Sequence, residues 1–261
     1  MLFQYIQSPA AAVMIRPHHF TSNPETATDN AFQSINTNET SEKIAAQARF
    51  EFDQAIQKMT DAGITVHVFD DFGECDTPDS VFPNNWFSTH QGGRIAMYPM
   101  HSPSRRRERR HDVMALLKQH YRVQEIVDYS GLEYDHLFLE GTGVMVFDHI
   151  ERVAYVGKSK RADPVILERF CTSFGYEPMV FDTADQKGAP IYHTNVMMAI
   201  GLEYAMICLD LIADPDRRTE VEMRLRHSGR DVIALSLAQI AEFAGNALEM
   251  TGKNGRVLVL S

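Results

Sequence analysis

The sequence predicts an α/β fold of repeated helix–strand–hairpin units that are arranged as blades around a central axis. Helical stripes alternate with short apolar strands, and a loop and a hairpin follow each strand. One polar residue stands directly before each hairpin, namely Asn85, Glu140, His193 and Asn246. These four positions are separated by 55, 53 and 53 residues. Such a near-constant period indicates a radial array of similar units.

Four helix–strand pairs account for the α/β content of the prediction. Each helix carries apolar side chains at helical spacing, and the strand that follows is short and apolar. Gly63, Gly175 and Gly229 end three of the helices, because glycine readily adopts the left-handed conformation that closes a helix. The expected pairs are residues 41–62 and 64–69, 105–121 and 123–127, 163–175 and 176–181, and 214–229 and 231–235.

Each hairpin consists of two apolar runs joined by residues that suit a tight turn. The expected hairpins cover residues 86–100, 144–157, 196–209 and 247–261. In a radial array, equivalent positions of successive units converge on the axis. We therefore expect Glu140 and His193 to face one central pocket, although either residue alone would be interpreted as an ordinary polar residue at a strand edge.

The composition is that of an ordinary globular protein. The chain has 261 residues, of which 44% are hydrophobic, and its 25 basic and 35 acidic residues give a net charge of −10. We expect one domain over residues 1–261. The acidic balance argues against a broad nucleic-acid surface, and no apolar run reaches about 20 residues, the length of a membrane span. Because no basic segment precedes the first apolar stretch, we expect a cytoplasmic protein.

Several common kinds of site are excluded by the pattern of residues. Cys75, Cys171 and Cys208 form no CxxC pair and the histidines lack HxxxH spacing, so neither a disulfide framework nor a metal site is expected. The sequence contains no GxGxxG, P-loop or GxSxG motif, which argues against common nucleotide-binding and serine-hydrolase sites. The oligomeric state stays open, a homo-oligomer included.

Two segments that precede hairpins carry candidate site residues. Asp79, Asn84 and Asn85 stand near Trp86, whose own side chain is expected in the core. Glu140 lies between an apolar pair and two glycines. An acid in that position is expected to be partly buried, and the glycines let a ligand approach the backbone. Taken alone, LEGTG also suits a capping glutamate.

His193 lies in an apolar segment, with Asn195 two residues later. Strand alternation would direct both side chains to the same face. A lone histidine in such a segment is usually a satisfied core residue, but its phase with Glu140 favours proton transfer near neutral pH. The arginine run at residues 105–110 is typical of a solvated helix face, and it also permits a clamp for a carboxylate.

In these segments the sequence resembles the amidinotransferase, or pentein, superfamily, and specifically its citrulline-utilisation hydrolase branch. The resemblance rests on MIRPHHF at residues 14–20, TPDSVFPNNW, RRRERR, LEGTG, IYHTNVMM and FAGNALEM, which occur in this order over nearly the whole chain. It implies a five-bladed α/β propeller of repeated units. It also implies a cysteine hydrolase or transferase of guanidino or ureido groups that needs no metal or organic cofactor.

The resemblance further implies roles for individual residues. His193 matches the catalytic general acid/base of the family, and Glu140 matches the acid that holds the terminal nitrogens of a small-molecule substrate. The side chains expected to recognise the rest of an amino-acid substrate are Asp79 and one or two of Arg105, Arg106 and Arg109.

Two positions differ from the arginine-processing relatives. Those relatives carry an HxD motif and a further acid after PDxxF, where this sequence has Asn195 and Asn85. A guanidinium presents only donors and a permanent charge, which suits facing carboxylates. A neutral ureido group also presents a carbonyl acceptor, which suits an amide. We therefore expect citrulline, converted to ornithine, as the substrate in preference to arginine.

The nucleophile is where the sequence departs from the resemblance. Relatives carry the catalytic cysteine in the last unit, after a glycine-rich GGG stretch near the C-terminus. None of the three cysteines of this chain fits that position. We therefore expect the fifth unit to be incomplete, the nucleophile to be absent from this chain and the 261-residue form to be inactive. Two other functions stay open, namely an arginine-directed deiminase or amidinotransferase, and a non-catalytic binding protein on the same scaffold.

Overall fold

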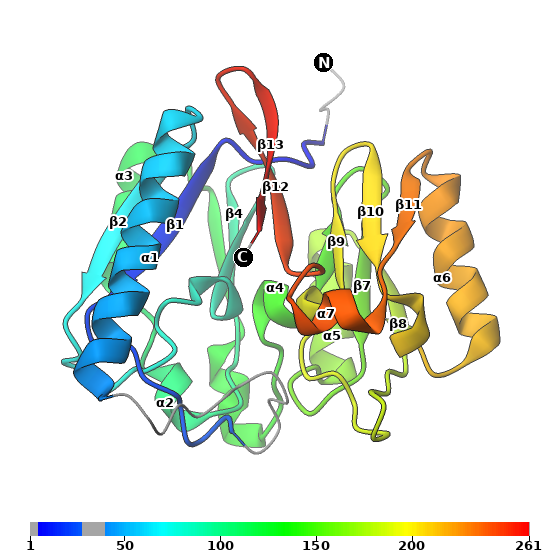
Figure 1. Cartoon of the computed structure of the whole chain (residues 1–261), viewed down its shortest axis with the longest axis horizontal. Helices are drawn as coiled ribbons and strands as arrows, with labels where there is room; N and C mark the ends of the chain where they lie inside the picture. Colours follow the sequence, from blue (N-terminus) through cyan, green and yellow to red (C-terminus); the bar gives the residue numbers. More distant parts are fainter. Residues whose placement is uncertain (1–4, 28–39, 261) are drawn as a thin grey trace.

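The computed structural model describes residues 5–27 and 40–260, so Ser261 of the last expected hairpin lies outside the described residues. The described residues form a mixed α/β fold with five small sheets (Figure 1). Three of the sheets follow one plan, in which an antiparallel hairpin is followed by a helix and then by a strand parallel to the second hairpin strand. This is the repeat that the spacing of polar residues predicts.

The three units of this plan are listed here in chain order. The first contains β3 (Phe87–His90), β4 (Arg94–Met97), α3 (His111–His120) and β5 (Glu125–Asp128). The second contains β6 (Val146–Asp148), β7 (Val153–Gly157), α5 (Pro164–Phe174) and β8 (Glu177–Phe181). The third contains β9 (Met198–Ile200), β10 (Tyr204–Ile207), α6 (Pro215–His227) and β11 (Asp231–Ala234).

The other two sheets each contain two strands in the described part of the chain. β1 (Ala11–Pro17) and β2 (Thr65–Asp71) are parallel and are joined through α1 (Ser41–Asp61). β12 (Ala247–Gly252) and β13 (Gly255–Leu260) form an antiparallel hairpin. The remaining short helices are α2 (Pro103–Arg106), α4 (Gly141–Val144) and α7 (Leu237–Ala241), and the 3-10 turns are η1 (Pro83–Asn85), η2 (Ser130–Asp135), η3 (Thr194–Val196) and η4 (Leu209–Leu211).

Helix ends follow the expected capping chemistry. Asp163 accepts hydrogen bonds from the backbone N–H groups of Val165 and Ile166 at the start of α5, and Gly175 ends this helix with φ 71°. The arginine run behaves differently from the prediction. Instead of one helix to Tyr121, it forms the short α2, and a new helix, α3, begins at His111.

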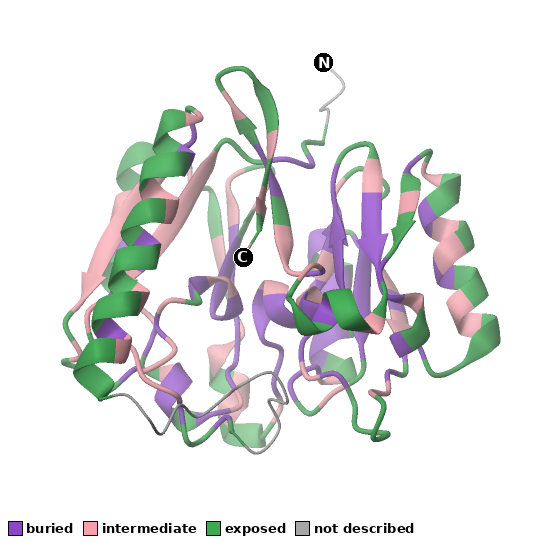
Figure 2. Cartoon of the chain, in the orientation of Figure 1, coloured by how far each residue is buried: buried purple, intermediate pink, exposed green. Residues whose placement is uncertain are grey.

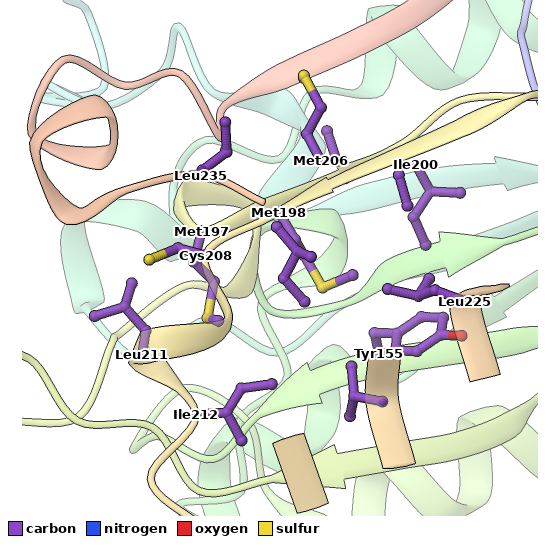
Figure 3. Packing of buried hydrophobic residues seen from close by; sticks show 14 of the residues in the cluster. Tyr155, Met197, Met198, Ile200, Met206, Cys208, Leu211, Ile212, Leu225 and Leu235 are labelled. Carbon is purple, nitrogen blue, oxygen red and sulfur yellow. The ribbon is translucent and has the colours of Figure 1, made fainter. Parts of the chain in front are cut away.

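Successive sheets pack against one another through apolar clusters. Figure 3 shows one of these clusters, in which Tyr155 of β7, Met198 of β9 and Leu225 of α6 meet between two units. Met250 of the last hairpin packs with Met59 and Ile64, and so joins that hairpin to the first sheet. Figure 2 shows that buried residues concentrate in the strands of the middle units, while α1 and α6 expose their outer faces. No helix in the described ranges is long and apolar enough to span a membrane.

A buried ion pair also joins two units. Arg230 precedes β11 and Asp148 ends β6, and both residues are at most 4% exposed. Arg230 donates from two nitrogens to the two carboxylate oxygens of Asp148, and the contact from Nη2 to Oδ1 is 3.0 Å. Its Nε donates to the carbonyl oxygen of Gly201 at 2.8 Å. Removing either charge would leave the other one buried without its partner, which is strongly destabilising.

We expect Asp148→Asn to lower the free energy of unfolding by about 3–5 kcal/mol, because Arg230 stays buried without a counter-charge. Asp182→Asn is the matched control, since Asp182 pairs with Lys158 at 2.8 Å where both side chains are more than half exposed. That exposed pair should contribute less than about 1 kcal/mol. Urea unfolding of both variants measures the difference, and equal losses would contradict the structural role of the buried pair.

Candidate active site

Glu140 lies at the centre of the candidate site. It occupies the position directly before α4, and its side chain is fully buried. One carboxylate oxygen, Oε2, lies 2.7 Å from Nε2 of His193. The other, Oε1, accepts a hydrogen bond from the backbone N–H of His101 at 3.0 Å. The two residues that the repeat places in phase are therefore in direct contact, although 53 positions separate them.

Two buried arginines surround the same carboxylate. Nη1 of Arg161 lies 3.3 Å from Oε2 of Glu140, and Nη1 of Arg105 lies 3.7 Å from it. The guanidinium of Arg161 also stacks over the ring of Tyr192 at 4.9 Å. Each arginine is at most 2% exposed. A fully buried carboxylate is stable only with such partners, because burial without them carries a large desolvation cost.

Asp79 joins the cluster through Arg105. Its Oδ2 lies 3.7 Å from Nε of Arg105 and accepts a hydrogen bond from the side chain of Asn23 at 2.8 Å. Arg105 in turn donates to both carboxylate oxygens of Glu108, at 2.9 and 3.1 Å. Four expected site residues, namely Glu140, His193, Arg105 and the half-buried Asp79, thus belong to one network of charges.

The protonation states follow from burial and charge. Burial alone would raise the pKa of Glu140, but the hydrogen bond to His193 and the charges of Arg161 and Arg105 outweigh it and hold the pKa well below its usual range. Burial lowers the pKa of His193 despite the adjacent carboxylate. Glu140 is therefore ionised and His193 is neutral near pH 7. Because an ionised carboxylate only accepts, Nε2 of His193 carries the proton.

Gly143 allows the three units to approach one another at this point. A Cβ atom at residue 143 would lie 2.8 Å from Cε1 and Nδ1 of the His193 ring, and closer still to Oδ1 of Asn85. Asn85, at the end of η1, is buried, and its side chain also approaches Gly143. The space that these two side chains leave at residue 143 admits nothing larger than a hydrogen atom. Gly143, the second glycine of LEGTG, is thus required by packing between Asn85 and His193.

The two asparagines expected to recognise a substrate lie in similar short turns. Oδ1 of Asn85 accepts a hydrogen bond from Nδ2 of Asn84 at 3.1 Å. Asn195 lies in η3, and its Oδ1 is buried without a hydrogen-bond partner in the described part of the chain. The expectation that strand alternation aligns Asn195 with His193 is wrong, because residues 194–196 form a 3-10 turn and β9 begins only at Met198.

The structure does not bring Arg106 and Arg109 to the Glu140–His193 pair. Arg106 donates to the carbonyl oxygens of Met100 and His101, both at 3.0 Å. The side chain of Arg109 contacts the carbonyl oxygen of Tyr98 at 3.2 Å and forms an ion pair with Glu133. Both guanidinium groups therefore hold the loop before α3, and Arg105 is the member of the arginine run that reaches the site.

No cysteine stands beside His193. Cys75 is exposed, and Cys171 and Cys208 are buried in two different apolar clusters. Burial raises the pKa of Cys171 to about 12 and also raises the pKa of Cys208. Because the thiolate is the nucleophilic form, these two thiols are inert near neutral pH. Among the residues that the structure describes, no group of His, Cys, Asp or Glu side chains is placed to hold a metal ion.

Sequence reasoning missed three contributors to the site. Arg161 follows Lys158 and Lys160 in a polar loop, which is typical of a solvated segment, and no sequence signal points to its burial. Glu108 follows Arg105 by three residues, and this spacing could have indicated an ion pair in a helical turn. The backbone N–H of His101 carries no signal in the sequence, because only the folded loop directs it at Glu140.

Comparison with known proteins places this geometry in context. Residues 16–261 match the protein family described as N,N-dimethylarginine dimethylhydrolase, eukaryotic. No protein with curated annotation matches the sequence significantly. Three solved structures illustrate the structural likeness. The N-terminal domain of ArgZ, an arginine dihydrolase from the ornithine–ammonia cycle in cyanobacteria, was crystallised as a cysteine-to-serine mutant bound to substrate. It is 17% identical, with a TM-score of 0.68 over 91% of this chain and 80% of that chain.

AgrE in a ternary complex with ornithine and NAD+ is 17% identical, with a TM-score of 0.69 over 94% of this chain and 32% of that chain. DDAH from Pseudomonas aeruginosa, a cysteine-to-serine mutant complexed with citrulline, is 12% identical, with a TM-score of 0.60 over 94% of this chain and 81% of that chain. The chain spans only about a third of the ArgZ chain in its apo structure, with 33% of that chain covered. At these identities the structural likeness shows the fold alone.

We expect Gly143→Ala to lower the free energy of unfolding by about 1–3 kcal/mol, because the added methyl group must displace Asn85 or the His193 ring. Gly131→Ala is the matched control, since a Cβ at that position meets nothing within 4 Å. Its effect should stay within about 1 kcal/mol. Thermal unfolding of both variants provides the measurement, and a Gly143→Ala protein as stable as the control would show that the close approach is not required.

Proposed function

Because the chain belongs to the N,N-dimethylarginine dimethylhydrolase family, we propose that its site binds the terminal carbon–nitrogen group of an arginine-derived amino acid, and that citrulline is the compound it fits best. The family and the structural neighbours are hydrolases of amidino carbon–nitrogen bonds. Membership of the amidinotransferase superfamily, expected from the motifs, is confirmed. The activity and the substrate of this chain are the proposal.

The proposed architecture is a five-bladed propeller. Five small sheets support it, as do the contacts between successive sheets and the packing of the last hairpin on α1 and β2. In such an arrangement the turns before β3, β6 and β9 lie near one axis, which accounts for the contacts among Asn85, Gly143 and His193.

The observation that carries the proposal is the hydrogen bond between Glu140 and His193. An ionised, fully buried carboxylate that faces a neutral histidine can accept hydrogen bonds from the N–H groups of a ligand, while the histidine accepts and returns a proton. Two guanidinium groups, of Arg105 and Arg161, supply positive charge beside it and so keep this carboxylate ionised while it accepts from the ligand.

The neutral amides at positions 85 and 195 are proposed to favour a ureido group over a guanidinium, and of these Asn85 approaches the His193 ring across Gly143. Asn85 uses its Oδ1 to accept from Asn84, and in the described residues its Nδ2 donates no hydrogen bond. An amide N–H can donate to the carbonyl oxygen of a ureido group, whereas a guanidinium presents only donors. Asn195 offers a buried carbonyl oxygen that would accept an N–H of the same group.

Turnover would require a thiolate beside the substrate. The thiol would pass its proton to His193 and add to the ureido carbon, and His193 would return the proton to the δ-nitrogen so that ornithine leaves. Water would then cleave the S-carbamoyl-cysteine to carbamate, which decomposes to ammonia and carbon dioxide, and the thiol would be regenerated. The three cysteines of this chain are exposed on the surface or buried in apolar clusters. We therefore propose that the 261-residue chain binds citrulline without hydrolysing it.

The second candidate ligand is a methylated arginine, which the description of the family names. Asp79 and Glu140 both flank Arg105, and a site with two carboxylates would also suit a cationic guanidino group. Direct comparison of citrulline, arginine and N,N-dimethylarginine discriminates between the two candidates. A non-catalytic module for macromolecules would bind none of the three.

We expect citrulline to bind the wild-type chain more tightly than arginine or N,N-dimethylarginine, because the amides match its neutral carbonyl. Asn85→Asp should shift the ratio of citrulline to arginine affinity by about tenfold towards arginine, since it adds a carboxylate that pairs with a cation. Isothermal titration calorimetry measures both affinities. An unchanged ratio in Asn85→Asp would remove Asn85 from the explanation of selectivity.

The same samples test turnover. We expect no ornithine above the buffer blank when citrulline is incubated with the wild-type chain. Ornithine formation that disappears in Cys75→Ser, Cys171→Ser or Cys208→Ser would contradict the absence of a nucleophile and would identify the cysteine that attacks.

A further inference from the structure

Arg105 stands between two buried carboxylates but makes hydrogen bonds to only one of them. Its Nε and Nη2 donate to the two oxygens of Glu108 at 2.9 and 3.1 Å. Its third nitrogen, Nη1, lies 3.7 Å from Oε2 of Glu140. The two groups form an ion pair at this distance, but they are too far apart for a hydrogen bond. A guanidinium forms its strongest contact with a carboxylate through two parallel N–H bonds, and here Glu108 takes both of them.

Oε2 of Glu140 already has two close partners. Nε2 of His193 lies 2.7 Å away and Nη1 of Arg161 lies 3.3 Å away. A second guanidinium at hydrogen-bond distance would compete with the N–H of His193 for the same oxygen. It would also occupy the negative charge of Glu140, which the proposed ligand needs for its N–H groups. A movement of less than one ångström would bring Arg105 from 3.7 Å to that distance.

Glu108 is placed by local structure to prevent this movement. Arg105 lies in α2, and the chain turns directly after it, so that the backbone N–H of Glu108 donates to the carbonyl oxygen of Arg105 at 3.2 Å. The side chains three residues apart therefore face one another. Glu108 is 3% exposed and Arg105 is 2% exposed, so water does not compete for their bonds.

We propose that Glu108 is a positioning residue that restrains Arg105 and so leaves Glu140 available to His193 and to a ligand. Burial raises the pKa of Glu108, and Arg105 opposes that rise. A carboxylate that accepts at both oxygens fits the ionised form. The effect on His193 stands on geometry alone, whereas the effect on ligand binding rests on the proposed function.

The test uses the full chain with nitrogen-15 in its histidines, at a pH of about 9.5, because burial raises the pKa of Glu108 to about 8 and its ionised form prevails above that value. We expect Glu108→Gln to weaken the hydrogen bond between His193 and Glu140, because Arg105 closes on the carboxylate. The Nε2 proton resonance of His193 should then move upfield. Glu108→Asp keeps the charge and should retain the wild-type resonance. Glu249→Gln is the matched control, since Glu249 is also buried but bonds to Ser8 and Leu202.

A double variant separates restraint from general damage to packing. Replacing the pair with Arg105→Met and Glu108→Leu removes the competing cation, and exchange of a buried ion pair for apolar residues is often tolerated. We expect the His193 resonance to return to its wild-type position. A resonance that moves equally in Glu108→Gln and in the double variant would overturn the proposal, as would one that does not move in Glu108→Gln.

Calorimetry then distinguishes the two proposals. We expect Glu108→Gln to weaken citrulline binding by about tenfold, with no more than about a twofold change in Glu249→Gln. A wild-type chain that binds no citrulline, together with the expected movement of the resonance, would reject the proposed function and retain the role of Glu108. Unchanged citrulline affinity in Glu108→Gln would reject its effect on the ligand.

Discussion

A carboxylate with no access to water is the constraint on which this site depends. Glu140 is fully buried, and its charge is tolerated because partners from separate parts of the chain converge on it. His193 comes from the turn before β9, Arg161 from the loop before α5, and a backbone N–H from His101. The approach of His193 in turn requires the absence of a side chain at Gly143. Electrostatics and packing thus impose the same arrangement.

The repeat made much of this arrangement predictable. The spacing of Asn85, Glu140 and His193 placed them at equivalent positions, and the structure brings their segments together. Proline and aspartate at helix starts and glycine at helix ends also marked the boundaries of α5 and α6 well. These signals are local and periodic, so that a single sequence contains them.

The parts that escaped prediction depend on tertiary contacts. Arg161 stands in a polar loop and becomes a buried partner of Glu140 only when two loops meet. Arg105, Arg106 and Arg109 look equivalent in the sequence, yet only Arg105 points to the site, because the run forms a turn rather than a continuous helix. Asn195 lies in a 3-10 turn, and the strand starts at Met198, two residues later than its apolar pattern suggests. Side-chain direction in short turns is not encoded by periodicity.

The protonation of the His193 ring tests the central claim most directly. Nitrogen-15 chemical shifts of that ring, followed from about pH 8 down to about pH 5, report both the charge and the position of the proton. The account predicts a neutral ring with its proton on Nε2 that stays neutral below pH 6.5, the ordinary pKa of histidine, because burial lowers its pKa. A ring that is doubly protonated at pH 6.5, or whose single proton is on Nδ1, would contradict the pairing of a neutral histidine with an ionised Glu140.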